Sequence, residues 1–149
     1  MPDITVMGAG IFGLSIAWSC QSLGARVRII DPGGPGAGAS GGVVGALAPH
    51  VPENWNDKKA FQLDSLLMAE AFWNEVADAG GGAPGYARLG RVQPVMDAAG
   101  LSLARAREAG AAQLWRGAAI WRVEAAEGAW CPTSPTGHVI RDTLSARIH

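Results

Sequence analysis

The 149-residue sequence contains only two cysteines, Cys20 and Cys131. Two cysteines cannot form the disulfide framework of a small secreted domain, and neither lies at a spacing typical of metal ligands. Cys20 falls within a predicted helix, where a buried thiol is the simpler interpretation. We therefore expect neither a disulfide framework nor a metal site.

The sequence also lacks an excess of charge of either sign. It has 12 basic and 13 acidic residues, which leave a formal net charge of -1. Nucleic acids and anionic membranes attract proteins through concentrated positive charge, so neither is an expected partner. The 6 tryptophans are scattered without interleaved basic residues, which also disfavours stacking on nucleic-acid bases.

No run of apolar residues reaches the roughly 18 that a membrane-spanning helix needs. The N-terminus is apolar, but it has no basic segment, contains Asp3 and is interrupted by glycines, so we expect no signal peptide. A chain of this length fits one domain and is long enough to bury a core. These features favour a cytoplasmic protein without a membrane span.

Glycine is abundant, and its most informative occurrence is the run GAGIFG at residues 8–13. The preceding segment 4–7 is rich in β-branched residues and predicts a buried strand, whereas apolar residues after the run recur at helical spacing. Residues 25–30 predict a second strand. It leads directly to Asp31, which lies 18 residues after Gly13. The order is strand, turn, helix, strand, with G-x-G-x-x-G at the turn.

Each glycine of this motif has a physical role in dinucleotide-binding proteins. Gly8 permits the tight turn out of the strand, and Gly10 allows a pyrophosphate to approach the backbone. Gly13 allows the helix to pack closely on the strand. The spacing therefore predicts a dinucleotide site, although a tight turn without a ligand is the alternative interpretation.

Other residues of this region are expected to complete the site. The backbone N–H groups of Ile11 and Phe12 open the helix and can donate to a pyrophosphate. Asp31 can accept hydrogen bonds from ribose hydroxyls. Residues 32–42 are rich in glycine and proline and read as a flexible linker or as a binding loop that presents the Ser40 hydroxyl. Because this segment leaves the carboxyl end of a strand, we favour the binding loop.

Four segments together resemble the FAD-dependent amino acid oxidase family, which includes D-amino acid oxidase, glycine oxidase and sarcosine oxidase. They are GAGIFG at 8–13, the pair Asp31-Pro32, GASGG at 38–42 and GALAP at 45–49. In that family, segments like the last two contact the phosphate, ribityl and flavin parts of FAD. The resemblance thus implies FAD as the cofactor, in preference to NAD, and adds Gly45 and Ala46 to the site. The expected cofactor contacts are Gly8, Gly10, Ile11, Phe12, Gly13, Asp31, Ser40, Gly45 and Ala46.

A long amphipathic helix is predicted over residues 56–79, where it is stopped by the glycines of 80–82. Its apolar stripe is more typical of a core than of a ligand site, and we expect it to be buried. The stripe consists of Phe61, Leu63, Leu66, Leu67, Phe72 and Val76.

Further along the chain, residues 86–96 predict one or two short strands, and Pro94 indicates an edge strand because it has no backbone N–H. Asp97 can cap a helix that continues through Ala109 and is closed by Gly110. Residues 118–123 predict a weaker strand or the start of a turn.

These elements predict an α/β fold: a Rossmann-like FAD-binding βαβ unit followed by a partial α+β substrate domain. By the resemblance, residues 1–79 are the first part of the FAD-binding domain and residues 80–137 a partial substrate domain. Residues 138–149 are then the start of a helix that returns to the FAD-binding domain. The later strands of the family have no counterpart, so we expect a truncated protein whose incomplete sheet favours association.

The resemblance implies hydride transfer from the α-carbon of a small amine or amino acid to the flavin, with hydrolysis of the resulting imine. Oxygen or another acceptor then reoxidises the flavin. No catalytic residue is predicted, since His50 reads as a loop histidine bonded to backbone, and Arg88 and Arg91 read as solvated charges. One βαβ unit contacts mainly the ADP half of FAD, so the isolated chain is expected to bind FAD weakly or not at all.

Three alternatives stay open. The chain can be a non-catalytic nucleotide-binding or interaction module, or a truncated and inactive fragment. It can also be a fragment of an NAD-dependent dehydrogenase, although such folds need no flavin-binding segment like residues 38–49.

Overall fold

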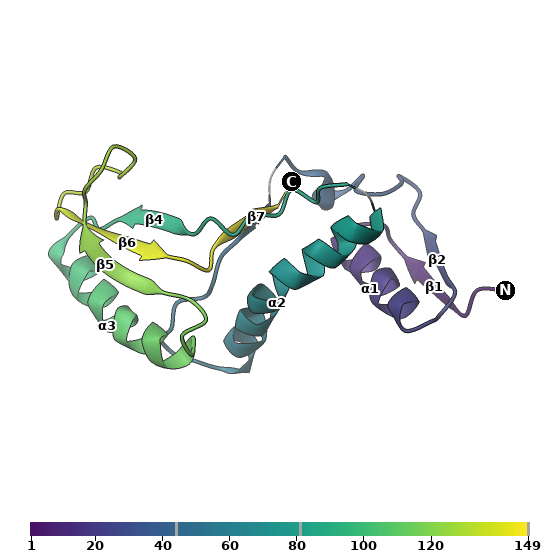
Figure 1. The fold of residues 1–149 in the computed structure, drawn as a ribbon, viewed down its shortest axis with the longest axis horizontal. Helices are drawn as coiled ribbons and strands as arrows, with labels where there is room; N and C mark the ends of the chain where they lie inside the picture. The colour runs from purple at the N-terminus through teal and green to yellow at the C-terminus, as the bar shows by residue number, and fades with distance from the viewer. Residues whose placement is uncertain (44, 81, 149) are drawn as a thin grey trace. The chain divides into compact units, whose positions relative to one another are not determined.

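A computed structural model describes residues 1–43, 45–80 and 82–148 (Figure 1). The expectations that involve Val44, Gly81 and His149 lie outside these residues. The chain divides into two compact units, Met1–Val43 and Val44–His149. The assignment of residues 1–79 and 80–137 to a cofactor domain and a substrate domain stays a prediction.

The first unit is a βαβ unit, as the sequence predicted. Strand β1 (Ile4–Met7) and strand β2 (Val27–Ile30) are parallel neighbours, joined by helix α1 (Ile11–Ser22). A short 3-10 turn, η1 (Ala39–Gly41), follows in the loop after β2. Parallel strands need such a crossover, because the chain must return to the same end of the sheet.

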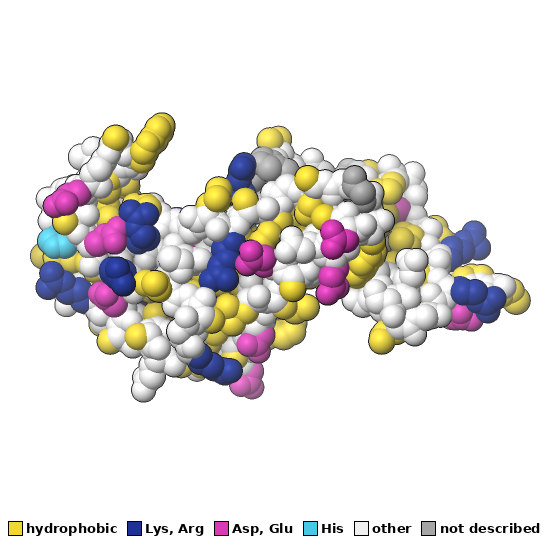
Figure 2. Space-filling model, viewed as in Figure 1, with side chains coloured by type: hydrophobic (Ala, Val, Ile, Leu, Met, Phe, Trp, Pro, Cys, Tyr) yellow, Lys and Arg dark blue, Asp and Glu magenta, His cyan; other side chains and the backbone are white. Residues whose placement is uncertain are grey.

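Residues 4–7 were predicted to form a buried strand, but of these only Val6 is buried, whereas Met7 is 73% exposed. The two strands also cover little of α1. Ala17 is buried, whereas Ile16 is 55% and Leu23 is 89% exposed. Parallel sheets are normally covered on both faces. Hydrophobic side chains accordingly reach the surface at several places on the face drawn in Figure 2.

The second unit contains two antiparallel sheets and two long helices. Strand β6 is the central strand of a three-stranded sheet with the order β4-β6-β5, while β3 pairs with β7. Figure 1 shows α3 lying along this three-stranded sheet. The elements are β3 (Gly45–Leu47), α2 (Asp57–Gly80), β4 (Arg91–Pro94), α3 (Ala98–Leu114), β5 (Trp121–Ala125), β6 (His138–Asp142) and β7 (Ala146–Ile148). Pro94 therefore lies on an outer strand of this sheet, as predicted.

The core of the second unit lies around two tryptophans. Trp115 is fully buried, and its ring meets that of Trp121 edge to face at a centroid distance of 6.1 Å. Leu63 and Leu66 of α2 pack into the same cluster, which confirms the predicted inner face of that helix. Phe61 was expected in the stripe but is 76% exposed, because it lies on the opposite side of the helix.

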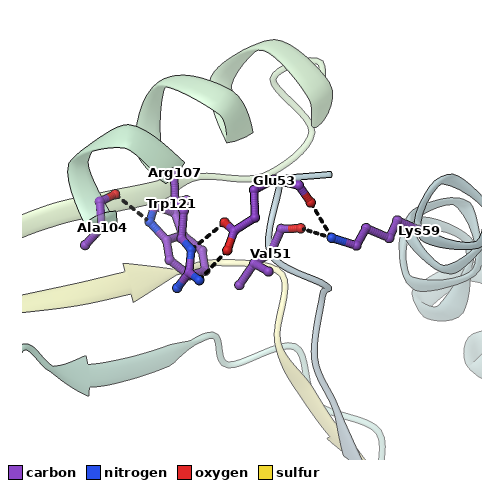
Figure 3. Close-up of polar contacts among 6 residues, drawn as sticks. All are labelled: Val51, Glu53, Lys59, Ala104, Arg107 and Trp121. Carbon is purple, nitrogen blue, oxygen red and sulfur yellow. Dashed lines mark hydrogen bonds and ion pairs between the residues drawn. The ribbon is translucent and has the colours of Figure 1, made fainter. Parts of the chain in front are cut away.

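A polar clamp fixes the segment between β3 and α2 (Figure 3). Arg107 of α3 donates to both carboxylate oxygens of Glu53, at 2.6 and 2.5 Å. Lys59 of α2 donates to the carbonyl oxygens of Val51, at 3.1 Å, and of Glu53. The Arg107 guanidinium lowers the pKa of the Glu53 carboxyl below its usual value. One short segment is thus tied to both long helices.

Helix α3 continues past the predicted end at Ala109 and reaches Leu114. Gly110, which was predicted to close the helix, lies inside it and has a packing role. A Cβ at this position would lie 3.3 Å from Cβ of Pro52, so the missing side chain lets the 51–56 segment approach the helix.

The predicted helix start at residues 138–149 is wrong, since β6 and β7 occupy this part of the chain. Val139 and Ile140 are β-branched and lie in the central strand, where both neighbours supply hydrogen bonds. The buried Asp142 then turns the chain by accepting hydrogen bonds from the backbone N–H groups of Leu144 and Ser145. Among the described helices, none is both long and apolar enough to cross a membrane.

Candidate cofactor-binding turn

The turn after β1 depends on Gly8. Its φ of +102° lies in a region that residues with a side chain rarely adopt. Its backbone N–H donates to the carbonyl oxygen of Ile30 at 2.8 Å, which keeps the end of β1 paired with β2. The chain can therefore leave the sheet sharply, as the motif predicted.

Gly13 sets the distance between α1 and this turn. A Cβ at residue 13 would lie 2.0 Å from the carbonyl oxygen of Gly8 and 3.4 Å from Cγ1 of Val6. Such an overlap with backbone cannot be relieved by a rotamer change. The predicted role of this glycine in close helix–strand packing is visible in the structure.

The N-terminus of α1 is capped from the loop after β2. Gly10 is the N-cap residue and has no side chain of its own, whereas Oγ of Ser40 accepts a hydrogen bond from the backbone N–H of Ile11 at 2.9 Å. A Cβ at Gly10 would lie 3.1 Å from that Oγ atom. The bare backbone at residue 10 thus leaves room for an oxygen atom in front of the helix.

The first turn of α1 is well suited to an anion. The opening N–H groups of a helix have no intrahelical acceptor and carry the positive end of its dipole. No acidic side chain lies in the first turn of α1, and Phe12 is 84% exposed. The first turn therefore contains no negative charge that would offset the positive end of the helix dipole.

Asp31 is held in place by two backbone N–H groups. Ala9 donates to Oδ2 and Gly33 donates to Oδ1, each at 2.8 Å. These hydrogen bonds, that from Ala9 first, lower the pKa of the Asp31 carboxyl, so the group is ionised at neutral pH. Each carboxylate oxygen keeps a lone pair for a further donor, such as a ribose hydroxyl.

The loop at residues 32–42 folds back onto the turn. The backbone N–H of Gly36 donates to the carbonyl oxygen of Ala9 at 2.9 Å. A Cβ at Gly41 would lie 2.3 Å from the carbonyl oxygen of Gly36, so the backbone makes a close turn between these two residues. These contacts support the interpretation of residues 32–42 as a binding loop beside the turn.

Over residues 3–145 the chain matches the family described as FAD dependent oxidoreductase. The chain belongs to this family. Within it, a curated relative from Psychrobacter sp. (strain PRwf-1) is 36% identical over 74 residues, which are 50% of this chain and 10% of the relative. That relative is named "tRNA 5-methylaminomethyl-2-thiouridine biosynthesis bifunctional protein MnmC".

Solved structures of amino acid enzymes share the fold. The L-amino acid deaminase from Proteus vulgaris superposes with a TM-score of 0.71 at 20% identity, over 99% of this chain and 34% of the deaminase. The glycine oxidase from Geobacillus kaustophilus gives a TM-score of 0.71 at 17% identity, over 99% of this chain and 40% of the oxidase. The chain thus spans well under half the length of these proteins.

The residues of the first unit fit the FAD on which this family depends. The N–H groups that open α1, beside the hydroxyl of Ser40, suit a diphosphate. The ionised Asp31 suits a ribose. Among the residues that the structure describes, no group of three or more His, Cys, Asp or Glu side chains is placed to bind a metal ion.

Gly45 and Ala46 lie in β3, within the second unit, where they pair with Ile148 and Arg147. A Cβ at Gly45 would lie 2.9 Å from Cγ2 of Ile148, so this glycine has a packing role in the ribbon formed by β3 and β7. Ala46 is exposed. Their expected contact with the cofactor stays a prediction.

The expectation that Arg88 and Arg91 are solvated charges is wrong. Arg88 donates to the carbonyl oxygens of Thr143 and Ala118, each at 2.8 Å. Nε of Arg91 lies 3.2 Å from Oδ2 of the buried Asp142. These partners follow at least 30 residues later in the sequence, so no local pattern indicates them.

Proposed function

We propose that this chain forms the N-terminal, cofactor-binding part of an oxidoreductase that uses FAD to oxidise small amines or amino acids. The observation that carries the proposal is the turn at residues 8–13. It presents the unneutralised start of a helix beside a fixed, ionised carboxylate. When bound, FAD supplies the acceptor for a hydride from the α-carbon of the substrate.

The roles of the residues follow from their hydrogen-bonding capacity. The N–H of Ile11, which was expected to donate to the diphosphate, donates to Oγ of Ser40 instead. The N–H groups of Phe12 and Gly13 are therefore the proposed donors to the diphosphate, and Asp31 is the proposed acceptor for the ribose. The Ser40 hydroxyl accepts from Ile11 and has its own proton to donate to a phosphate oxygen. Ser40 therefore contributes both to the helix cap and to the cofactor site.

The substrate class is supported by the proteins with the same fold, since one is named a deaminase of L-amino acids and another an oxidase of glycine. A primary or secondary amine with a hydrogen on its α-carbon is the chemistry shared by such substrates. We assign no catalytic residue.

A non-catalytic nucleotide-binding module is the second candidate. It is favoured by the fact that the chain spans only 34% of the deaminase, while the diphosphate-binding turn lies entirely within the first unit. Both candidates bind the cofactor, but only the oxidoreductase reduces the flavin with a substrate.

Cofactor binding is tested by titrating the full chain with FAD and measuring the dissociation constant. Asp31→Ala should weaken binding about tenfold, because a hydrogen bond to a charged group is lost. Asp3→Ala is the matched control, since Asp3 is also in the first unit but pairs with Arg26 away from the turn. Equal affinities of both variants and the unmodified chain would contradict the proposed site.

Activity is tested by mixing the FAD-loaded protein with amino acids without oxygen and following the absorbance of oxidised flavin. Bleaching by an amino acid supports the oxidoreductase. Stable binding of FAD without bleaching by any amino acid or amine supports the module.

A further inference from the structure

The outer edge of β5 carries backbone groups that point away from its sheet. Ile120 and Ala126, which flank β5, make backbone hydrogen bonds to the residues that flank β6. Backbone groups of an antiparallel strand alternate in direction, so the N–H and C=O groups of Trp121, Val123 and Ala125 face away from β6. An edge of this kind is a template for pairing with another strand.

We propose that β5 pairs antiparallel with β5 of a second copy of the chain, with Val123 of one copy opposite Val123 of the other. The three-stranded sheets of the two copies then continue into each other across a two-fold axis. In this register Trp121 and Ala125 of the second copy exchange the outward-facing hydrogen bonds. Arg122 lies opposite Glu124 of the second copy.

The charges of β5 select this register among the possible ones. Arg122 and Glu124 of the second copy form a pair without backbone hydrogen bonds between them, where side chains of an antiparallel sheet approach most closely. If the two-fold axis passed through residue 122 or 124 instead, Arg122 or Glu124 would face its own counterpart. Opposite charges in facing positions stabilise a sheet, whereas like charges destabilise it.

Arg122 has no negative partner of its own. Its side chain is exposed, and within residues 1–43, 45–80 and 82–148 no carboxylate pairs with it. Across β6 it lies opposite Arg141, whose Nε binds Oε1 of Glu124 at 2.5 Å. Two guanidinium groups therefore share one carboxylate on this face of the sheet. Glu124 of a second copy supplies the carboxylate that Arg122 lacks.

The structure has open space beside this edge. A cavity of about 300 Å³ lies beside α3 and the start of β5, lined by residues that include Ala112, Ile120 and Trp121. The part of the second copy that approaches the start of β5 is the end of its own β5, where the side chains are those of Ala125 and Ala126. The approaching strand end therefore brings no large side chain into this space.

Glu108 of α3 competes with a second copy for this edge. Its Oε2 accepts a hydrogen bond from the N–H of Val123 at 3.4 Å, which is long for such a bond. The carbonyl oxygen of a neighbouring strand can approach an N–H to about 2.9 Å. The 5 residues of β5 make a short edge compared with a standard interface, so we expect a weak dimer that forms at high protein concentration.

The test is sedimentation equilibrium of the full chain without FAD, over a wide range of protein concentrations. We expect the unmodified chain to show a reversible equilibrium between monomer and dimer. Arg122→Glu should weaken the dimer about tenfold or more, because it places carboxylates face to face at two symmetric positions. Arg105→Glu makes the same change of charge at an exposed position of α3 and should leave the dimer unchanged.

A mixture of two variants makes the test specific for this register. Glu124→Arg alone should also weaken the dimer, because it places guanidinium groups face to face. An equal mixture of the Arg122→Glu and Glu124→Arg chains should associate more tightly than either variant alone, since opposite charges then face each other at both positions. Far-ultraviolet circular dichroism verifies that both variants are folded.

Several outcomes would overturn the proposal. The chain could stay monomeric at every concentration, or it could form open-ended assemblies larger than a dimer. A dimer that Arg122→Glu and Arg105→Glu affect equally would lie on another surface, and a mixture no tighter than its components would exclude this register. β5 lies within the second unit, so none of these outcomes depends on the proposed cofactor site.

Discussion

Gly13 has no room for a side chain, because a Cβ there would overlap the carbonyl oxygen of Gly8. Gly10 differs, since the nearest atom to its missing Cβ is the side-chain oxygen of Ser40, which can move. Two glycines of one motif thus have different physical roles. Gly13 maintains the packing of the helix, while Gly10 leaves room for the Ser40 hydroxyl that caps the helix.

Gly13→Ala should destabilise the first unit by about 1–3 kcal/mol, because the added methyl group overlaps backbone atoms. Gly42→Ala is the control, since the one atom within 4 Å of its missing Cβ is the carbonyl oxygen of Ala39 at an ordinary 3.6 Å, and its φ of -62° and ψ of 154° are extended. That change should be neutral or slightly stabilising, as it restricts the unfolded chain. Free energies of unfolding from urea denaturation give the comparison, and equal values would contradict the packing role of Gly13.

The sequence motif predicted which residues form the turn, because each glycine is required by local backbone geometry. It did not predict that Asp31 is fixed by Ala9 and Gly33, or that Ser40 caps α1. Those hydrogen bonds depend on how the loop at residues 32–42 folds back. The sequence carries no periodic signal for such a loop.

Among the secondary-structure elements, the outer strand β5 shows how a helix can protect the edge of a sheet. The backbone N–H of Thr143 donates to the carbonyl oxygen of Ile120, and that of Ala126 donates to the carbonyl oxygen of Gly137. Backbone groups of an antiparallel strand alternate between facing the partner strand and facing away from it, so the N–H of Val123 points away from β6. Oε2 of Glu108 on α3 accepts from that N–H at 3.4 Å. A charged side chain at this position opposes pairing with another strand.

Glu108→Ala should therefore increase self-association of the chain, because it exposes the edge of β5. Glu75→Ala removes the same charge from an exposed position of α2 and controls for the change in net charge. Sedimentation velocity over a range of protein concentrations measures the effect. If both variants associate to the same extent, Glu108 does not protect this edge.

The clamp between α3 and the segment before α2 predicts a dependence of stability on pH. The Arg107 guanidinium lowers the pKa of Glu53 below its usual 4.5. The clamp is therefore fully present above that pH, and its contribution is lost as the pH falls through the lowered pKa of the folded state. The loss should be about 1 kcal/mol or less, because the pair is partly exposed.

Glu53→Gln should remove the part of the acid-induced loss of stability that comes from protonation of Glu53. Free energies of unfolding from urea denaturation at pH 7 and pH 3, for the variant and the unmodified chain, measure this part. The variant should be less stable than the unmodified chain at pH 7, and the two should converge at pH 3. A constant difference between them at both pH values would show that titration of Glu53 contributes nothing.

The predicted elements were most accurate where the signal was local. Helix α2 (Asp57–Gly80) lies within one residue of its predicted bounds. In contrast, β7 pairs with β3, from which it is separated by about 100 residues, and no local pattern identifies such a partner. The end of α3 was missed for a related reason, since Pro52 lies far from Gly110 in the sequence.

For the whole molecule, membership of the FAD dependent oxidoreductase family rests on a match over residues 3–145. The resemblance in the first 49 residues predicted this membership correctly. The assignment of an activity goes beyond family membership and is a proposal, because the chain spans only 34% of the deaminase and 40% of the glycine oxidase. The central claim therefore concerns the cofactor turn, which the first unit contains in full.

The most direct test is nuclear magnetic resonance of the 15N-labelled chain during titration with FAD, which detects weak binding at single backbone amides. We predict saturable shifts that are largest at residues 8–13, at Gly33 beside Asp31 and at Ser40. These shifts should be absent when riboflavin, which has no diphosphate, replaces FAD. Shifts confined to other residues, or no saturable shift at any FAD concentration, would contradict the account.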